Sequence, residues 1–238
     1  MPSTSATTVR PIGDGLKTSY LGRIDYASAL SLQREAHARV VTGEISSTFL
    51  MLEHPHIYTL GRRGNDADIL IGPERLAALG IDVEHVDRGG EVTYHGPGQL
   101  IGYPVINLKE WGGGPLKYVR ALESMLIATL GELGISAQSE DRPTGVWIGN
   151  AKVAAIGVRV SKNVTTHGFA LNVHPDLSYF DHIVPCGDTD AGVTSVVAQG
   201  KIDVDVASVV PIVARHFKEV FGWSIEWVMA EEMELGWK

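Results

Sequence analysis

Three β-rich runs follow one another at residues 146–148, 152–160 and 164–173, with only short turns between them. The turns are Gly149-Asn150 and Lys162-Asn163. Two-residue connections join antiparallel neighbours, because a parallel pair needs a crossover of a dozen or more residues. The sequence therefore predicts an antiparallel meander at this point, around which the rest of the chain must fold.

Helical patterns elsewhere in the chain are few, and most of them are long. Predicted helices cover residues 25–41 with Asp25 as the cap, 73–79 followed by Gly80, 116–133 and 204–220, where Pro211 favours a kink or a later start. Short strands are predicted at 19–22, 47–53, 57–60, 81–86, 91–95 and 99–108, the last two flanking Gly96-Pro97-Gly98. Because regular βαβα alternation is missing, we expect an α+β domain whose mixed, mostly antiparallel sheet is packed with helices.

Composition excludes several classes of protein. The net charge is −8, from 20 basic and 28 acidic residues, and no basic run is long enough for a nucleic-acid-binding tail. One cysteine cannot form a disulfide within the chain, which favours a reducing compartment. No apolar stretch is long enough to span a membrane, and the N-terminus has no secretory signal. We expect a disordered tail at 1–15, which is rich in Ser and Thr and faintly similar to a transit peptide. A single domain follows at 16–238.

The segment at residues 87–100 (DRGGEVTYHGPGQL) concentrates glycine and polar residues around a short strand. Gly89-Gly90 permits positive φ and close backbone approach, while Arg88 and His95 place polar groups at both ends. This segment can line a substrate pocket with main-chain N–H groups, or it can be two hairpin turns on a strand. Its glycines match neither nucleotide-binding fingerprint.

Lys152 begins the run KVAAIGVRV, and strict alternation would place it on one face with Ala154, Ile156, Val158 and Val160. A lysine on such an apolar face either extends from the strand end to water or is held dehydrated. Dehydration lowers the pKa of a lysine and makes it a possible base.

Cys186 lies between Pro185 and Gly187, in a constrained turn and not in an apolar periodic run. A lone cysteine is commonly a small buried hydrophobe, whereas a nucleophilic thiolate needs exposure and a nearby cation or base. The sequence pattern leaves both roles open for this residue.

Two histidine-containing segments are further candidates. His167-Gly168 interrupts an apolar strand, and a glycine inside a strand often marks a bulge or the approach of a ligand, although a core histidine fits equally. His54-Pro55-His56 has no acid or second histidine pair at metal-ligand spacing, so we expect no metal.

Four blocks in this order resemble one family: RGGEVTYHGPGQLIGYP, GVWIGNAKVAAIGVRV, HGFALNV and PCG. LEHPHIYTLGRR at 52–63 is also similar to that family's N-terminal segment. The family is the lipoyl(octanoyl) transferases, and the resemblance extends from Tyr20 to beyond Ser195. It implies the fold of biotin and lipoate protein ligase catalytic domains.

The resemblance also implies the roles of particular residues. Cys186 would carry an octanoyl group as a thioester, and Lys152 would lower the cysteine pKa and serve as acid and base. The implied substrate-binding residues form three groups: Arg88, Gly89, Gly90, Glu91, Val92, Thr93, Tyr94 and His95; Ala155, Ile156 and Gly157; and Gly168, Phe169 and Ala170.

The implied reaction needs neither ATP nor another cofactor, because it exchanges one thioester for another and then forms an amide. The implied donor is octanoyl-acyl carrier protein. The implied acceptors are lipoyl domains of 2-oxoacid dehydrogenase E2 subunits and of the glycine cleavage H protein, in the cytoplasm.

Three alternatives remain from the sequence alone. An ATP-dependent lipoate–protein ligase shares the fold but needs no cysteine, and a non-catalytic lipoyl-domain-binding module needs neither Cys186 nor Lys152. A Cys-His hydrolase is disfavoured because no acid that would orient the histidine is identifiable.

Overall fold

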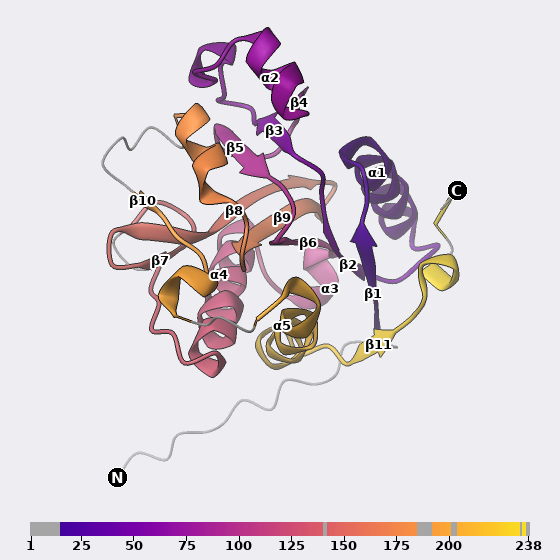
Figure 1. Cartoon of the computed structure of the whole chain (residues 1–238). Helices are drawn as coiled ribbons and strands as arrows, with labels where there is room; N and C mark the ends of the chain where they lie inside the picture. The colour runs from indigo at the N-terminus through magenta and orange to yellow at the C-terminus, as the bar shows by residue number, and fades with distance from the viewer. Residues whose placement is uncertain (1–14, 140–141, 185–191, 201–203, 234, 237–238) are drawn as a thin grey trace.

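The computed structural model describes residues 15–139, 142–184, 192–200, 204–233 and 235–236. Cys186 and the predicted tail at 1–14 therefore lie outside the described residues. The predicted α+β architecture is confirmed: one large mixed sheet and one small sheet pack with helices (Figure 1).

The large sheet has eight strands, seven of them in the order β10-β8-β9-β6-β2-β1-β11, with β7 paired to β8. Its strands are β1 (Leu16–Arg23), β2 (Thr48–Glu53), β6 (Gln99–Val105), β7 (Val146–Ile148), β8 (Ala151–Ser161), β9 (Val164–Asn172), β10 (Gly192–Val193) and β11 (Ile225–Trp227). The predicted meander is β7-β8-β9, antiparallel throughout. Lys162 and Asn163 both have positive φ, 51° and 64°, as a tight hairpin turn requires.

The small sheet has the order β4-β3-β5, from β3 (Ile57–Leu60), β4 (Asp82–His85) and β5 (Val92–His95). It carries the helix α2 (Pro73–Leu79) and a separate core around Tyr58 and Tyr94. The predicted strands at 91–95 and 99–108 do not form a hairpin. β5 pairs with β3, whereas β6 crosses into the large sheet, so Gly96-Pro97-Gly98 connects two sheets.

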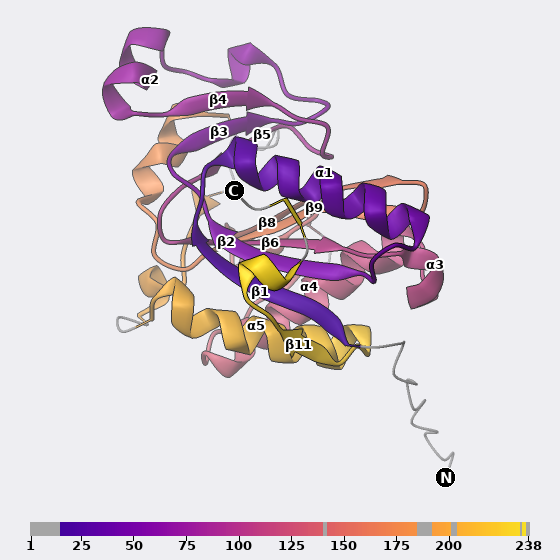
Figure 2. The ribbon, with the colours of Figure 1, turned by 90° about the vertical axis from the view of Figure 1, so that its right-hand side faces the viewer.

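Helices cover both faces of the large sheet (Figure 2). One face packs under α4 (Pro115–Glu132) and α5 (Val206–Phe221), and the other packs under α1 (Tyr26–Thr42). Asp25 caps α1 as predicted, accepting a hydrogen bond from the Ser28 N–H. Pro211 lies inside α5, so the later helix start that we considered is wrong.

Short helices complete the described chain. They are α3 (Leu108–Trp111), with 3-10 turns at Asp66–Asp68, Leu177–His182, Val197–Gln199 and Ala230–Met233. No helix in the described part of the chain is long and apolar enough to cross a membrane.

Candidate active site

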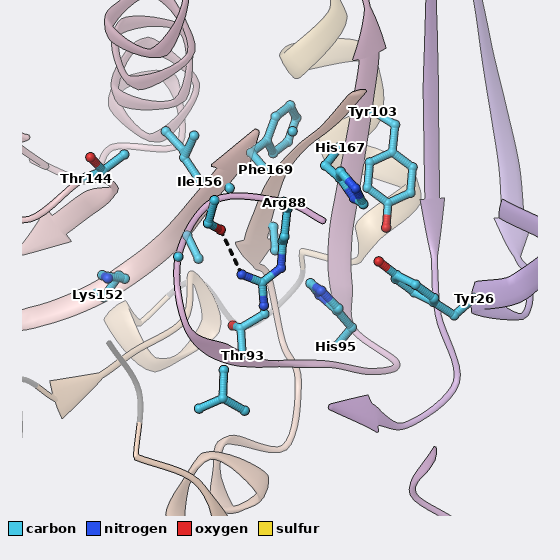
Figure 3. A pocket seen from close by; sticks show the side chains of 17 residues that line it. Tyr26, Arg88, Thr93, His95, Tyr103, Thr144, Lys152, Ile156, His167 and Phe169 are labelled. Carbon is cyan, nitrogen blue, oxygen red and sulfur yellow. Dashed lines mark hydrogen bonds between the residues drawn. The ribbon is translucent and has the colours of Figure 1, made fainter. Parts of the chain in front are cut away.

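A narrow pocket, partly open to solvent, lies between the small sheet and the large sheet. Its walls come from the segment at residues 88–90, β5, β8, β9, Tyr26 at the start of α1, and Tyr103 on β6. Figure 3 shows Lys152 and Thr144 at one end and His167, Tyr26 and Tyr103 at the other. The pocket is therefore elongated, with an amine at one end and aromatic and imidazole rings at the other.

Arg88 is buried against the small sheet, with only 7% of its surface exposed. Its guanidinium donates to the Thr59 carbonyl at 2.6 Å, to the Thr59 hydroxyl at 2.9 Å and to the Gly89 carbonyl at 3.0 Å. These bonds fix the arginine as a rigid positive wall of the pocket. A buried cation held in this way attracts an oxygen-rich or electron-rich group of a ligand.

The segment at residues 88–90 packs closely against β8 on one side and Gly61 on the other, because glycines lie at the contact points. A Cβ on Gly157 would be 3.0 Å from the Gly89 carbonyl oxygen, and one on Gly61 would be 2.5 Å from the Gly90 carbonyl oxygen. The Gly89 N–H donates to the Val158 carbonyl at 3.0 Å, which joins the segment to the large sheet. The absence of a side chain at Gly61 and Gly157 therefore lets the backbone at residues 88–90 pack closely against both neighbours.

His95 is buried in a hydrogen-bonded chain that fixes its tautomer. The Gln99 amide group donates to Asn172 Oδ1 at 2.8 Å, so its oxygen is the atom that faces His95 Nδ1 at 2.8 Å and Nδ1 carries the proton. His95 Nε2 then accepts from the Thr59 hydroxyl at 3.4 Å. Burial holds the pKa of His95 well below its usual range, so the ring is neutral. Asn172 continues the chain by donating to the Thr194 carbonyl.

Lys152 faces the pocket because of a β-bulge. The β7–β8 register shifts between Trp147, opposite Lys152, and Val146, opposite Ala154, leaving Val153 as an extra residue. Val153 and Ala154 are both fully buried in the core under α4, and Lys152 lines the pocket with Ala155. The expectation from strict alternation, that Lys152 shares a face with Ala154, is therefore wrong. Lys152 Nζ lies 4.7 Å from the centroid of the Trp147 ring.

His167 has a left-handed backbone, with φ of 56°. Its neighbours Thr165 and Phe169 face the core beneath α4 and α5, where alternation would also place His167. The positive φ instead turns the imidazole to the other face, edge-on to Tyr103. We expected a bulge or the approach of a ligand at Gly168, and Gly168 does line the pocket, while the irregular backbone is that of His167. Gly168 is required because a Cβ there would be 2.1 Å from the Gly102 carbonyl oxygen.

The pocket brings together most of the predicted substrate-binding residues. Its lining includes Arg88, Gly89, Gly90, Val92, Thr93, His95, Ala155, Ile156, Gly157, Gly168, Phe169 and Ala170, together with Lys152. Glu91 and Tyr94 do not line it: Glu91 lies 3.7 Å from Arg63, and Tyr94 packs in the core of the small sheet.

Sequence reasoning did not place Tyr26, Tyr103, Thr144 or His167 in this pocket. Only His167 carried a signal, as a polar residue in an apolar strand. Tyr26 and Tyr103 lie on elements whose periodicity indicates burial and cannot show that the buried ring borders a cavity.

Cys186 lies outside the described residues, but the strand that follows its segment is described. β10 pairs in parallel with the start of β8, with Val193 opposite Lys152, and the Thr194 N–H donates to the Lys152 carbonyl at 3.0 Å. Among the described residues, no group of three or more His, Cys, Asp or Glu could hold a metal ion.

Comparison with known proteins defines the class. The family model described as the lipoyl protein ligase A/B catalytic domain matches residues 25–218. The chain therefore belongs to this family. Relatives of this chain include octanoyltransferases: that of Solibacter usitatus is 49% identical over 86% of this chain and 92% of its own length. An octanoyltransferase of Caldicellulosiruptor saccharolyticus is 42% identical over 92% of this chain and 94% of its own length.

Solved structures agree on the fold. A crystal structure of lipoate-protein ligase A bound with ATP has a TM-score of 0.77 at 18% identity, covering 93% of this chain and 91% of that chain. A biotin protein ligase from Aquifex aeolicus, in complex with biotin and ATP, has a TM-score of 0.53 at 16% identity. The match covers 87% of this chain and 70% of that chain. The predicted relation to biotin and lipoate ligase catalytic domains is confirmed at the level of fold.

Proposed function

We propose that this acyltransferase moves an octanoyl group from octanoyl-acyl carrier protein to a lysine of lipoyl domains, through a thioester on Cys186 with Lys152 as acid and base. The observation that carries the proposal is the position of Lys152 at one end of an elongated pocket with Ala155, Ile156, Phe169 and Ala170 in its walls. Burying an acyl chain there stabilises the complex by about 0.8 kcal/mol per CH₂.

The reaction proceeds in two balanced exchanges. The Cys186 thiolate attacks the donor thioester carbonyl, a new C–S bond forms, and the donor C–S bond breaks to release the carrier thiol. The lysine ε-amine of the acceptor then attacks the acyl-cysteine, an amide forms, and Cys186 leaves as thiolate. In the first exchange Lys152 gives its proton to the departing carrier thiolate, and in the second it takes up the proton that the attacking amine loses.

The local charge supports docking of an acidic carrier despite the net charge of −8. Arg142 lies 5.6 Å from the Trp147 ring centroid, over the same ring as Lys152, and two cations therefore lie at this end of the pocket. A positive region of this kind steers acidic partners to the site. We propose octanoyl-acyl carrier protein as donor, 2-oxoacid dehydrogenase E2 subunits and glycine cleavage H protein as acceptors, and the cytoplasm as the location.

Intact mass spectrometry tests the proposal. The protein is mixed with octanoyl-acyl carrier protein without ATP, and we expect a gain of one octanoyl group on Cys186, which passes to an added lipoyl domain. The variant Cys186→Ser should neither gain the group nor transfer it, because serine lacks a base strong enough to form an alkoxide.

The same measurement separates the alternatives. Loading of free octanoate or lipoate that depends on ATP would show a ligase. If the lipoyl domain binds to this protein but its mass stays unchanged, the protein is a non-catalytic module. Near-native transfer by Cys186→Ser, with an unchanged melting temperature, would contradict the acyl-cysteine mechanism. Ser178→Ala, outside the pocket, is the control.

A further inference from the structure

A second cavity adjoins the pocket beyond His167. It is lined by Leu30, Gln33, Arg34, His37, Asp87, Arg159, Ser161, Lys162, Thr166 and His167, so its walls are mostly polar and several carry positive charge. Of all these residues, only His167 also lines the acyl pocket. The imidazole is therefore the shared wall between an acyl-binding space and a charged one.

Three contacts from separate elements brace this wall. His167 Nε2 lies 2.9 Å from Asp87 Oδ1, and Asp87 is itself paired with Arg159. The His167 N–H donates to Gln33 Oε1 on α1 at 2.7 Å, outside the regular ladder of the sheet. The Tyr103 ring packs edge-on to the imidazole at 6.4 Å between centroids.

The bracing holds the imidazole in one tautomer. Burial, with help from Arg88 and Arg159, lowers the pKa of His167 to about 4, so the neutral ring donates its Nε2–H to the Asp87 carboxylate. His167 is 2% exposed and has a backbone conformation that non-glycine residues adopt at some energetic cost. A residue in this conformation persists only where its surroundings determine it strongly, which is common at functional sites.

We infer that the His167 imidazole, fixed by Asp87, is the wall that limits the length of acyl chain the pocket accepts. The inference rests on the proposed function and adds the residue that determines specificity. His167 pairs with Val158, well along β8 from Lys152, so it lies at the end where an acyl chain starting beside Lys152 would finish. A longer chain would meet the ring, and beyond it the charged groups of Arg34, Arg159 and Lys162.

The test compares donors of six to sixteen carbons with the wild type and two variants. His167→Gly removes the ring and suits the positive φ. We expect its ratio of kcat/KM for dodecanoyl to octanoyl donors to rise about tenfold or more, since pockets discriminate methylene groups on this scale. Thr166→Ala alters only the second cavity and should leave the ratio unchanged.

An unchanged ratio in folded His167→Gly would overturn the inference. Should this variant fail to fold, His167→Asn replaces it, because asparagine tolerates a left-handed backbone and is shorter than histidine. Calorimetry of octanoate and dodecanoate binding tests the role of the His167 ring without enzyme turnover. The His167 variant should lose the preference for octanoate over dodecanoate. Absence of transfer by the wild type would refute the proposed function, and the calorimetric ratio would still decide the role of His167.

Discussion

At the scale of single residues, the ammonium group of Lys152 can act in two distinguishable ways. It can stabilise a thiolate by its charge alone, or it can also release and regain a proton. Arginine keeps the charge but cannot lose its proton at accessible pH. We expect Lys152→Arg to lose transfer almost as fully as Lys152→Ala, by about 10²–10⁴-fold.

Two measurements on these variants separate the roles. The pH dependence of Cys186 alkylation reports the pKa of the thiol, which we expect to stay low in Lys152→Arg and to rise in Lys152→Ala. The transfer rate reports the proton role. An arginine variant within a few-fold of the wild type would leave Lys152 with an electrostatic role only. Lys109→Arg, at an exposed position, is the control.

The chemistry-bearing residues were easier to predict from sequence than the residues that shape their surroundings. Arg88, His95 and Lys152 stand out locally, because each is polar within a glycine-rich or apolar stretch. The turn of Lys152 toward the pocket could not be predicted, since it depends on a bulge at Val153 formed against β7. Alternation within one strand carries no information about such a register shift.

At the scale of elements, the segment at 61–63 holds the segment at 88–91 in place. The N–H groups of Gly61, Arg62 and Arg63 donate to the carbonyls of Glu91, Arg88 and Gly90, respectively. The backbone of one segment is thus the support on which the pocket wall rests. The two stretches therefore form one unit of the pocket wall, although they are separated in the sequence.

Gly61→Ala tests that support. The new Cβ would lie 2.5 Å from the Gly90 carbonyl oxygen and 2.8 Å from Arg88 Nη1, so the wall must shift. We expect kcat/KM to fall about tenfold or more, and the free energy of unfolding to fall by about 1–3 kcal/mol, as for other overpacked sites. Assays of initial rate and urea denaturation measure these effects.

Gly72→Ala is the matched control for this variant. Nothing lies within 4 Å of a Cβ at Gly72, and its φ of −78° suits any L-residue. We expect this protein to be as active as the wild type and to lose at most about 1 kcal/mol of stability, because Gly72 is the N-cap of α2 and alanine caps a helix less well. Equal activity of both alanine variants would show that the position of the Arg88 segment does not matter for turnover.

The elements themselves were largely predictable, but their partners were not. The runs that became β5 and β6 have clear strand patterns, and the Gly-Pro-Gly between them is typical of a turn. They nevertheless join different sheets, because β5 completes its pairing with β3 and β6 lies between β2 and β9. Long-range pairing of this kind depends on tertiary packing, which local residue patterns do not specify.

At the scale of the whole molecule, buried histidines make stability depend on pH. Burial lowers the pKa of both His54 and His167 to about 4, against about 6.5 in an unfolded chain. The unfolded state therefore binds more protons between these values, and stability falls as the pH drops from about 6.5 to about 4. Each histidine contributes up to about 3 kcal/mol to this loss.

Urea denaturation at steps from pH 7.5 to pH 4.5 measures the dependence. His54 donates from Nδ1 to the Ile24 carbonyl and accepts the Tyr103 hydroxyl at Nε2, both at 2.9 Å. His54→Asn removes the titration of this imidazole. We therefore expect the free energy of unfolding to fall less steeply with decreasing pH than in the wild type, whatever the variant's stability at neutral pH. Equal slopes in the wild type and in His54→Asn would contradict the assignment.

The parallel strand β11 has a consequence for the order of events during synthesis. β1 lies between β2 and β11, and Leu16 pairs with Ile225, so its outer edge gains its partner only when almost the whole described chain has been made. Until then that edge presents unpaired N–H and C=O groups, the kind of surface at which nascent chains associate wrongly. The outer edge of β1 therefore stays unpaired through most of synthesis, and it is a surface that a chaperone of nascent chains would cover.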